Sequence, residues 1–282
     1  MVWLIVVLLG IIQGVTEWLP VSSTGHMLLF EDLLPMPVTP AFRGLFMVVI
    51  QFGSIMAVLT LYGGRLWPFG RTKAPEVRRA PLALWGKVLL ASAPAAVIGF
   101  LLDDRIEAVI YARSGVKCAV IAASLIVYGV GFIVTERWLR SRGDRTEHVG
   151  DLTVRDAFVI GCFQTLALIP GTSRSGSTII GARLCRVSRP AAAEFSFFLA
   201  IPVMFGASLL KIGKYFLRDG LTMSGREVGL LLVGFAVAFL VSLVVIRFLM
   251  DFVRRHSFAG FGWYRIALGA AVLLYGCFCL GR

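Results

Sequence analysis

Polar and ionisable side chains gather in a short run near the start of a chain that is otherwise mostly apolar. Gln13 and Glu17 are four residues apart, which on a helix places both side chains on one face. Ser22, Ser23 and His26 follow within ten residues. Each such group costs a few kcal/mol at the centre of a bilayer, so the run predicts a functional site. The alternative is structural: the run lies at a wet hairpin mouth, the serines cap a helix, and His26 is interfacial.

A second run, residues 170–178, combines glycines, hydroxyl groups and one arginine. A turn of this composition that opens a helix presents backbone N–H groups and the positive end of the helix dipole to an anion. Arg174 adds a planar fork of donors, which suits bidentate binding of phosphate. Hydroxyl donors are available from Ser173, Ser175, Ser177 and Thr178. The run predicts an anion cradle. A hinge in which Arg174 pairs with a carboxylate such as Glu17 is the competing interpretation, and a resting site could use that pair.

Together the two runs hold the groups that phosphoryl transfer requires. The reaction needs charge neutralisation on the equatorial phosphate oxygens, an in-line nucleophile and a group that manages protons. Arg174 and its turn would supply the first. Ser23 or His26 would supply the nucleophile while the other handles protons. Glu17, with Gln13 beside it, would bind a divalent metal on a diphosphate through oxygen, or would instead orient His26.

The composition places these residues in a membrane protein. Of the 282 residues, 58% are hydrophobic and 16% are charged, whereas soluble domains carry roughly 25% charged residues. The net charge of +12 does not indicate a nucleic-acid binder, because the 28 Lys and Arg residues lie mostly in short loops between apolar segments, where they orient membrane proteins. Membrane lipids are the expected surroundings, and no nucleic-acid partner is expected.

We expect an all-α fold, formed by a single integral membrane domain over residues 1–282. Six apolar segments are long enough to cross the roughly 30 Å of bilayer hydrocarbon. They are 45–63, 83–102, 116–136, 191–212, 228–249 and 263–280. Two further segments, 2–30 and 154–186, each hold two short apolar runs separated by Pro, small and hydroxyl residues. We interpret both as re-entrant helix–loop–helix hairpins.

The charges of the loops predict the topology. Loops 64–82 and 137–155 are rich in Lys and Arg and are expected on the cytoplasmic side. When the membrane crossings are counted from these two cytoplasmic loops, the first hairpin enters the membrane from outside and the second from inside. Both hairpins also carry a Gly-x-x-Gln sequence ahead of a Pro, which suggests an inverted-topology repeat of roughly 1–110 and 150–282. Such repeats are typical of transporters, whose sites lie near the midplane.

The two runs resemble the motifs of the undecaprenyl-diphosphatase family, whose members are also called bacitracin-resistance proteins. The family's (Glu/Gln)-x-x-x-Glu motif falls on Gln13 and Glu17, and its Pro-Gly-x-Ser-Arg-Ser-x-x-Thr motif falls on 170–178. The likeness extends over nearly the whole chain and is also strong in 194–197, Glu-Phe-Ser-Phe. Many members have Glu where this chain has Gln13, so a metal site with two carboxylates is weakened.

The resemblance implies hydrolysis of undecaprenyl diphosphate to undecaprenyl phosphate and inorganic phosphate, which recycles the lipid carrier of peptidoglycan and other cell-wall polymers. It implies a divalent cation (Mg²⁺ or Ca²⁺), six spans with two re-entrant hairpins, and bacitracin resistance on overexpression. It also implies a site that faces the periplasm from the bacterial plasma (inner) membrane. The implied catalytic residues are Glu17, Ser23, His26 and Arg174, and Glu17 would also bind the metal. The implied substrate-binding residues are Gln13, Ser173, Arg174, Ser175, Gly176 and Thr178.

A transporter or flippase for an anionic lipid or a small anion is the main alternative, since inverted repeats and broken helices are typical of transporters. A transporter that only binds its anion has less need of a carboxylate, a hydroxyl group and an imidazole opposite the anion cradle, such as Glu17, Ser23 and His26, which argues against this class. Acid phosphatases that use two histidines are a third class. The sequence 23–26, Ser-Thr-Gly-His, echoes part of their pattern, but a second well-placed His is lacking. A homodimer, the identity of the metal and the preferred prenyl chain length are left open.

Overall fold

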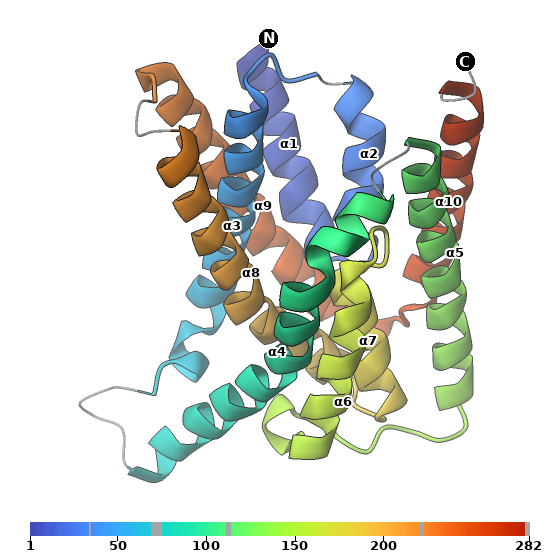
Figure 1. Cartoon of the computed structure of the whole chain (residues 1–282). Coiled ribbons are helices and arrows are strands. Elements are labelled where there is room, and N and C mark those ends of the chain that lie inside the picture. The colour runs from blue at the N-terminus through green and yellow to red at the C-terminus, as the bar shows by residue number, and fades with distance from the viewer. Residues whose placement is uncertain (34, 69–74, 111–113, 220–222, 280–282) are drawn as a thin grey trace.

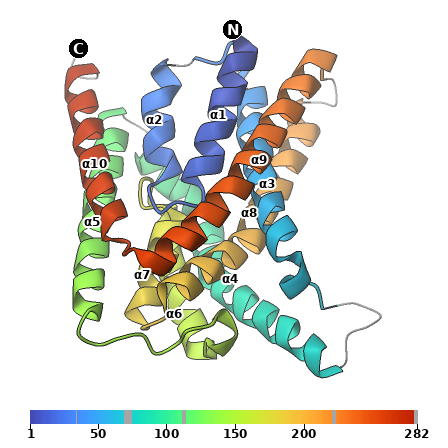
Figure 2. The same cartoon turned by 180° about the vertical axis from the view of Figure 1, so that it is seen from behind.

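The computed structural model describes residues 1–33, 35–68, 75–110, 114–219 and 223–279, which form an all-α fold (Figures 1 and 2). The ten α-helices among these residues are α1 (Val2–Thr16), α2 (Ser23–Leu33), α3 (Pro40–Leu66), α4 (Pro75–Ile110), α5 (Ser114–Leu139), α6 (Val154–Thr165), α7 (Arg174–Leu184), α8 (Arg189–Asp219), α9 (Gly225–Arg255) and α10 (Ala259–Cys279). Two short 3-10 helices, η1 (Val149–Asp151) and η2 (Leu166–Leu168), flank α6.

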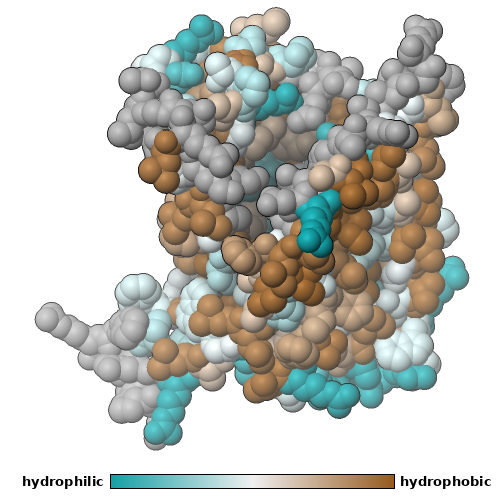
Figure 3. Space-filling view, in the orientation of Figure 1, coloured by the Kyte–Doolittle hydropathy of each residue, from teal (hydrophilic) through white to brown (hydrophobic). Residues whose placement is uncertain are grey.

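Five helical stretches in the described part of the chain are long and apolar enough to cross a membrane. They are Pro40–Leu66, Arg79–Leu102, Gly115–Leu139, Arg189–Leu210 and Gly225–Arg255. These stretches overlap the first five predicted spans, which confirms a multi-pass α-helical membrane protein. The sixth predicted span, 263–280, falls on α10, which carries Arg265 and packs along α5; residue 280 lies outside the described residues. Figure 3 shows the broad apolar surface of one face, with hydrophilic residues toward its two ends.

Both predicted hairpins are present as helix–loop–helix units, and they point in opposite directions (Figure 1). The pair α1 and α2 opens toward the end where both termini lie, whereas α6 and α7 open toward the other end. At 1.5 Å per residue, the 15-residue α1 reaches about 22 Å, which is too short for roughly 30 Å of hydrocarbon. Pro20 and Pro170 lie in the turns, where a helix does not continue, so the chain reverses near the middle of the protein.

Arginine-rich loops gather at the end of the molecule opposite the termini. Figure 1 places the end of α3, the start of α4 and the connection from α5 to α6 together at its lower end. There, Arg183 of α7 donates to Glu136 at 3.2 Å and to Asp144 at 2.7 Å, and Arg189 of α8 donates to the same Glu136 at 2.6 Å. These ion pairs join α5, α7 and α8. The arrangement agrees with the loop charges that predicted the topology.

The packing partners of the two halves of the chain correspond. Helix α1 packs on α9 as α6 packs on α4, and α5 packs on α10. If α1–α5 correspond in order to α6–α10, the pair α1–α9 is equivalent to the pair α6–α4, and α5 is equivalent to its own partner α10. This is the pattern that an inverted repeat requires. The division into repeats at roughly 1–110 and 150–282 stays a prediction.

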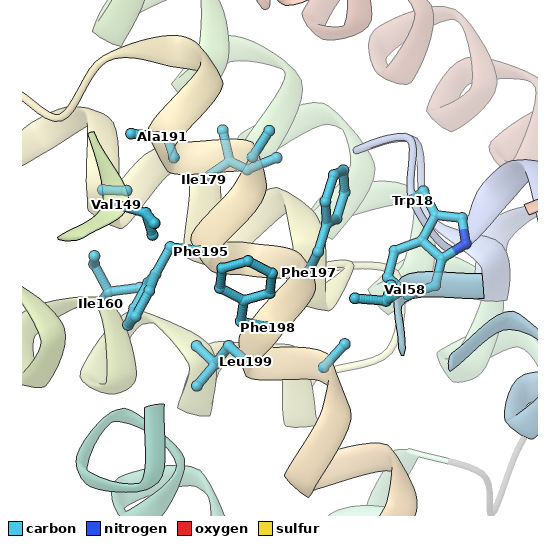
Figure 4. Close-up of a cluster of buried hydrophobic side chains, with 14 of the residues drawn as sticks. Trp18, Val58, Val149, Ile160, Ile179, Ala191, Phe195, Phe197, Phe198 and Leu199 are labelled. Carbon is cyan, nitrogen blue, oxygen red and sulfur yellow. The ribbon is translucent and has the colours of Figure 1, made fainter. Parts of the chain in front are cut away.

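The largest hydrophobic core surrounds α8 and includes side chains from both hairpins, among them Trp18, Ile160 and Ile179 (Figure 4). Phe195, Phe197 and Phe198 of α8 are fully buried, and Trp18 from the first turn packs edge-on against Phe197 with a ring-centroid distance of 5.3 Å. Full burial of a large apolar side chain contributes about 1.5–3 kcal/mol. Since Trp18 directly follows Glu17, this core also anchors the backbone at Glu17.

Candidate active site

Glu17 and Arg174, 157 residues apart in the chain, meet where the two hairpin turns come together. Arg174 Nη2 donates a hydrogen bond to Glu17 Oε1 at 3.1 Å, and Gln13 Nε2 donates one to Glu17 Oε2 at 3.0 Å. Glu17 ends α1 in a helical conformation, so Gln13 and Glu17 keep the spacing of one helical turn. The pairing of Arg174 with Glu17, which the sequence offered as a competing interpretation, is thus present. It joins the carboxylate of one motif to the arginine of the other.

The Arg174 guanidinium is also held from the side of α8. Its Nη1 donates to the backbone carbonyl of Ser196 at 2.8 Å. Its Nε is buried and has no hydrogen-bond partner within the described part of the chain. A buried donor without a partner costs roughly 1–3 kcal/mol. The guanidinium therefore keeps one donor that a bound anion would satisfy.

Each hairpin turn ends in a serine with a positive φ angle. Ser22 has φ 74° and Ser173 has φ 70°, directly before α2 and α7. Such a conformation costs a non-glycine residue about 1–3 kcal/mol and persists only where the surrounding structure imposes it. Ser173 Oγ accepts from the Gly176 N–H at 3.2 Å, and Ser22 Oγ accepts from the Gly25 N–H at 3.3 Å. Both capped helix N-termini thus direct their positive ends toward the turns.

Buried hydroxyl groups hold α7 to the first hairpin turn and to α8. Ser175 Oγ donates to the backbone carbonyl of Glu17 at 3.3 Å. Thr178 Oγ1 donates to the carbonyl of Arg174 at 2.9 Å and lies 2.8 Å from Ser196 Oγ. These bonds occupy both hydroxyl groups, so in this structure Ser175 and Thr178 position the turns. The contact of either hydroxyl with substrate stays a prediction.

A cavity of about 180 Å³ lies between the turns and is lined by residues of both motifs. Its lining includes Glu17, Ser23, Ser173, Arg174 and Ser175. Of these, Ser23 and Ser173 are half-buried, so their hydroxyl groups are the more accessible ones, whereas Glu17 and Arg174 are only about a tenth exposed. Figure 3 shows the surface hollowed in the upper half of the molecule, the half into which the first hairpin opens. The structure therefore brings together one carboxylate, two accessible hydroxyl groups and one arginine.

Two other predicted residues, and the stretch 194–197, lie beside this cavity or away from it. Gln13 supports Glu17 through the bond described above and is buried. Gly176 lies against Arg265 of α10. Glu194, in the Glu-Phe-Ser-Phe stretch, pairs with Arg65 at 2.6 Å in a larger cavity of about 860 Å³ at the end that carries the arginine-rich loops. Its neighbour Ser196 is the residue of that stretch that contacts Arg174.

His26 does not line the cavity that contains Glu17 and Arg174, but a neighbouring apolar one. Its Nδ1 lies 2.7 Å from the Ser22 carbonyl oxygen, and its Nε2 lies 2.7 Å from the Tyr264 hydroxyl. A carbonyl only accepts, so in the neutral ring Nδ1 carries the proton and Nε2 accepts from Tyr264. The ring lines an apolar cavity of about 470 Å³ formed by α1, α2, α9 and α10, and Thr16 lines both cavities. Ser22 and Tyr264, not Glu17, orient His26 in this structure, so that alternative prediction is wrong here.

Arg265 is the most important residue that the sequence interpretation missed. It is fully buried in α10 and donates hydrogen bonds to backbone carbonyls in both turns. A single arginine within an apolar segment is itself a signal, because a charge at membrane depth is costly. Ser196 was also missed, although its stretch was recognised as similar to the family.

The oxygen atoms around Glu17 are of the kind that binds a hard divalent cation. No group of three His, Cys, Asp or Glu side chains within the described ranges could hold a metal ion. The cavity lining offers one carboxylate, from Glu17, and neutral oxygens from Ser23, Thr24 and Gln51. Mg²⁺ is typically bound by one or two carboxylates together with water and substrate phosphates. These residues therefore fit a cation that takes its remaining ligands from the substrate.

Comparisons with known proteins agree along nearly the whole chain. The family model of the bacitracin resistance protein BacA matches residues 6–271. An undecaprenyl-diphosphatase of Desulfitobacterium hafniense is 47% identical over 270 residues, which are 95% of this chain and 94% of the relative. One of Enterococcus faecalis is 47% identical over 272 residues, 96% of both chains. Undecaprenyl-diphosphatase 1 of Clostridioides difficile is 49% identical over 269 residues, 95% of this chain and 94% of the relative.

Proposed function

Because the chain belongs to the bacitracin resistance protein BacA family, we propose that it is an undecaprenyl-diphosphate phosphatase, which releases inorganic phosphate and leaves undecaprenyl phosphate. The observation that carries the proposal is the buried Glu17–Arg174 pair at the meeting point of the two hairpin turns. It combines a carboxylate with an arginine whose guanidinium suits phosphate, in surroundings where charged groups are costly and indicate a function by default.

Arg174 and the start of α7 would bind the terminal phosphate. The helix N-terminus favours an anion, Ser173 offers a hydroxyl group, and Arg174 has a buried Nε without a partner. Bidentate binding would turn Arg174 from Glu17 toward the phosphate oxygens. The Glu17 carboxylate would then be free to hold a divalent cation, with Gln13 keeping it in place. When bound, that cation neutralises charge on the diphosphate oxygens.

Ser23 is the better placed of the two candidate nucleophiles. It begins α2 and lines the cavity with Arg174, whereas His26 lines the neighbouring apolar cavity. In-line attack by Ser23 Oγ on the terminal phosphorus forms a phosphoserine and breaks the bond to the bridging oxygen. The serine proton leaves with undecaprenyl phosphate, and water then releases inorganic phosphate and restores the serine. Acid-quenched protein should carry phosphate on the peptide that contains Ser23. A Ser23→Ala variant with wild-type turnover would contradict this assignment.

The site would open to the periplasmic side of the bacterial plasma membrane. In support, the first hairpin opens at the end of the molecule opposite the arginine-rich loops. The side chain of Trp3 is exposed at that end of α1. A Trp3→Cys variant in which all five native cysteines are replaced should react with a membrane-impermeant maleimide in spheroplasts. Reaction only in inverted vesicles would contradict this orientation.

Phosphate release from undecaprenyl diphosphate by the purified protein in detergent tests the activity itself. We expect release that EDTA abolishes and that added Mg²⁺ restores. The opposed hairpins also favour a transporter or flippase for an anionic lipid. Folded protein that binds the lipid diphosphate yet releases no phosphate with any divalent cation would support that second function and overturn the first.

A further inference from the structure

Arg265 of α10 joins the two hairpin turns through backbone carbonyl groups. Its Nη1 donates to the Pro20 carbonyl in the first turn at 3.2 Å. Its Nη2 donates to the carbonyls of Gly171 and Thr172 in the second turn, at 2.9 Å each. The cavity with Glu17 and Arg174 lies between these same turns. One side chain from a third element thus connects the two segments that frame the site.

The guanidinium of Arg265 has no carboxylate within ion-pair distance in the part of the chain that the structure describes. The guanidinium lies over the ring of Tyr128, whose centroid is 5.5 Å from the guanidinium carbon. Arg183, which is also buried, instead pairs with Glu136 and Asp144. An unpaired buried cation costs several kcal/mol unless hydrogen bonds offset that cost. The carbonyl groups of the two turns supply those bonds.

Gly176 gives Arg265 the room that this arrangement needs. A Cβ atom at this position would stand 3.1 Å from Arg265 Nη1 and 3.4 Å from Ser173 Cβ. The first turn of α7 therefore lies so close to the guanidinium that a side chain at position 176 would need Arg265 to shift by a few tenths of an ångström. The same turn carries Arg174, so a displacement of Arg265 would displace the phosphate-binding arginine as well. In this structure Gly176 packs against Arg265, and its predicted role in substrate binding stays a prediction.

We propose that Arg265 is a positioning residue for the hydrolysis, which holds the two turns at a fixed separation so that Glu17 and Ser23 face Arg174 across one diphosphate. The inference rests on the proposed function, because only a substrate held by both turns makes their separation matter. Arg265 binds backbone carbonyl groups and not side chains. Its loss would therefore shift the backbone of both turns. A misplacement of about 1 Å can cost roughly 10²-fold in rate.

The test compares Arg265→Ala and Arg265→Lys in turnover of undecaprenyl diphosphate and in melting temperature. For alanine we expect kcat about 100-fold lower with KM changed less than about threefold, because the groups that bind the diphosphate remain. Lysine keeps the charge but lacks the planar fork that reaches both turns, so it should recover part of the activity and leave kcat roughly tenfold lower.

Arg183→Ala is the matched control, since it removes a buried arginine at the far end of α7. It should lower the melting temperature and leave kcat per folded molecule within about twofold of wild type. The inference is overturned if folded Arg265 variants keep wild-type kcat, if the loss appears only in KM, or if Arg183→Ala loses as much kcat. If the alanine variant does not fold, the lysine variant decides by the same criteria. Wild-type protein without phosphate release would instead overturn the proposed function.

Discussion

Replacing Gly176 by alanine would show how closely α7 must approach Arg265. The added Cβ would stand 3.1 Å from Arg265 Nη1, about 0.4 Å inside an ordinary contact of roughly 3.5 Å. Relief of this contact would move the guanidinium, and with it the turn carbonyls, by a similar distance. If a 1 Å displacement costs about 10²-fold, then kcat should fall roughly sixfold.

The same substitution should change the stability of the fold only modestly. Alanine exceeds glycine in helix propensity by about 1 kcal/mol, and Gly176 lies in the first turn of α7. Overpacking at a tight contact costs about 1–3 kcal/mol. The gain offsets part of the cost and leaves a net loss of at most about 2 kcal/mol. The expected result is therefore lower turnover in a protein that still folds, with a melting temperature at or modestly below that of wild type.

The assay measures kcat for phosphate release from undecaprenyl diphosphate together with thermal unfolding in the same detergent. Gly86→Ala is the matched control, because Gly86 is an exposed helical glycine of α4 whose Cβ would meet nothing within 4 Å. It should keep wild-type kcat. Equal kcat values for Gly176→Ala and Gly86→Ala would refute the reasoning, as would a Gly176→Ala protein whose lost activity follows lost folding.

Two further predictions concern other parts of the molecule. Tyr264→Phe removes the hydroxyl group that donates to His26 Nε2, a bond worth about 1 kcal/mol. If His26 handles protons, kcat should change roughly fivefold and the pH–rate profile should shift, whereas an unchanged profile would remove His26 from the proton path. Burial favours the neutral Asp156 carboxyl, but hydrogen bonds and charge from Arg145, with bonds from Thr153, hold its pKa below the usual 3.8. This stabilisation is fully present above pH about 4 and is lost as pH falls through the lowered pKa. The melting temperature of Asp156→Asn should therefore lie below that of wild type at pH 7 and approach it in acid; a gap that is constant with pH would contradict this.

The hairpins could be predicted because their signals are local. Two short apolar runs around Pro20, and two around Pro170, are each too short to cross a bilayer, and this alone requires a chain reversal at membrane depth. The pairing of Glu17 with Arg174 could be offered as an interpretation for a similar reason. Opposite charges in apolar surroundings need partners, and few partners were available.

The roles of Arg265 and the orientation of His26 could not be predicted in the same way. Arg265 binds carbonyl groups that lie 245, 94 and 93 residues away, and a backbone carbonyl carries no residue-specific signal. The face that His26 presents depends on how α10 packs beside α2, which brings Tyr264 to the ring. Both contacts are set by tertiary packing of a helix far along the chain. Only the unusual position of a lone arginine in 263–280 was visible beforehand.

A double-mutant cycle on Glu17 and Arg174 tests the central claim most directly, because the claim is that these residues act together on one diphosphate. The rate of phosphate release from undecaprenyl diphosphate would be measured for wild type, Glu17→Gln, Arg174→Lys and the double variant. Each single change should cost about 10²-fold or more, since each removes transition-state charge stabilisation. The double variant should lose little beyond the worse single variant, because residues that act as a unit are not additive. Losses that multiply to about 10⁴-fold, or a single variant with wild-type turnover, would contradict the account.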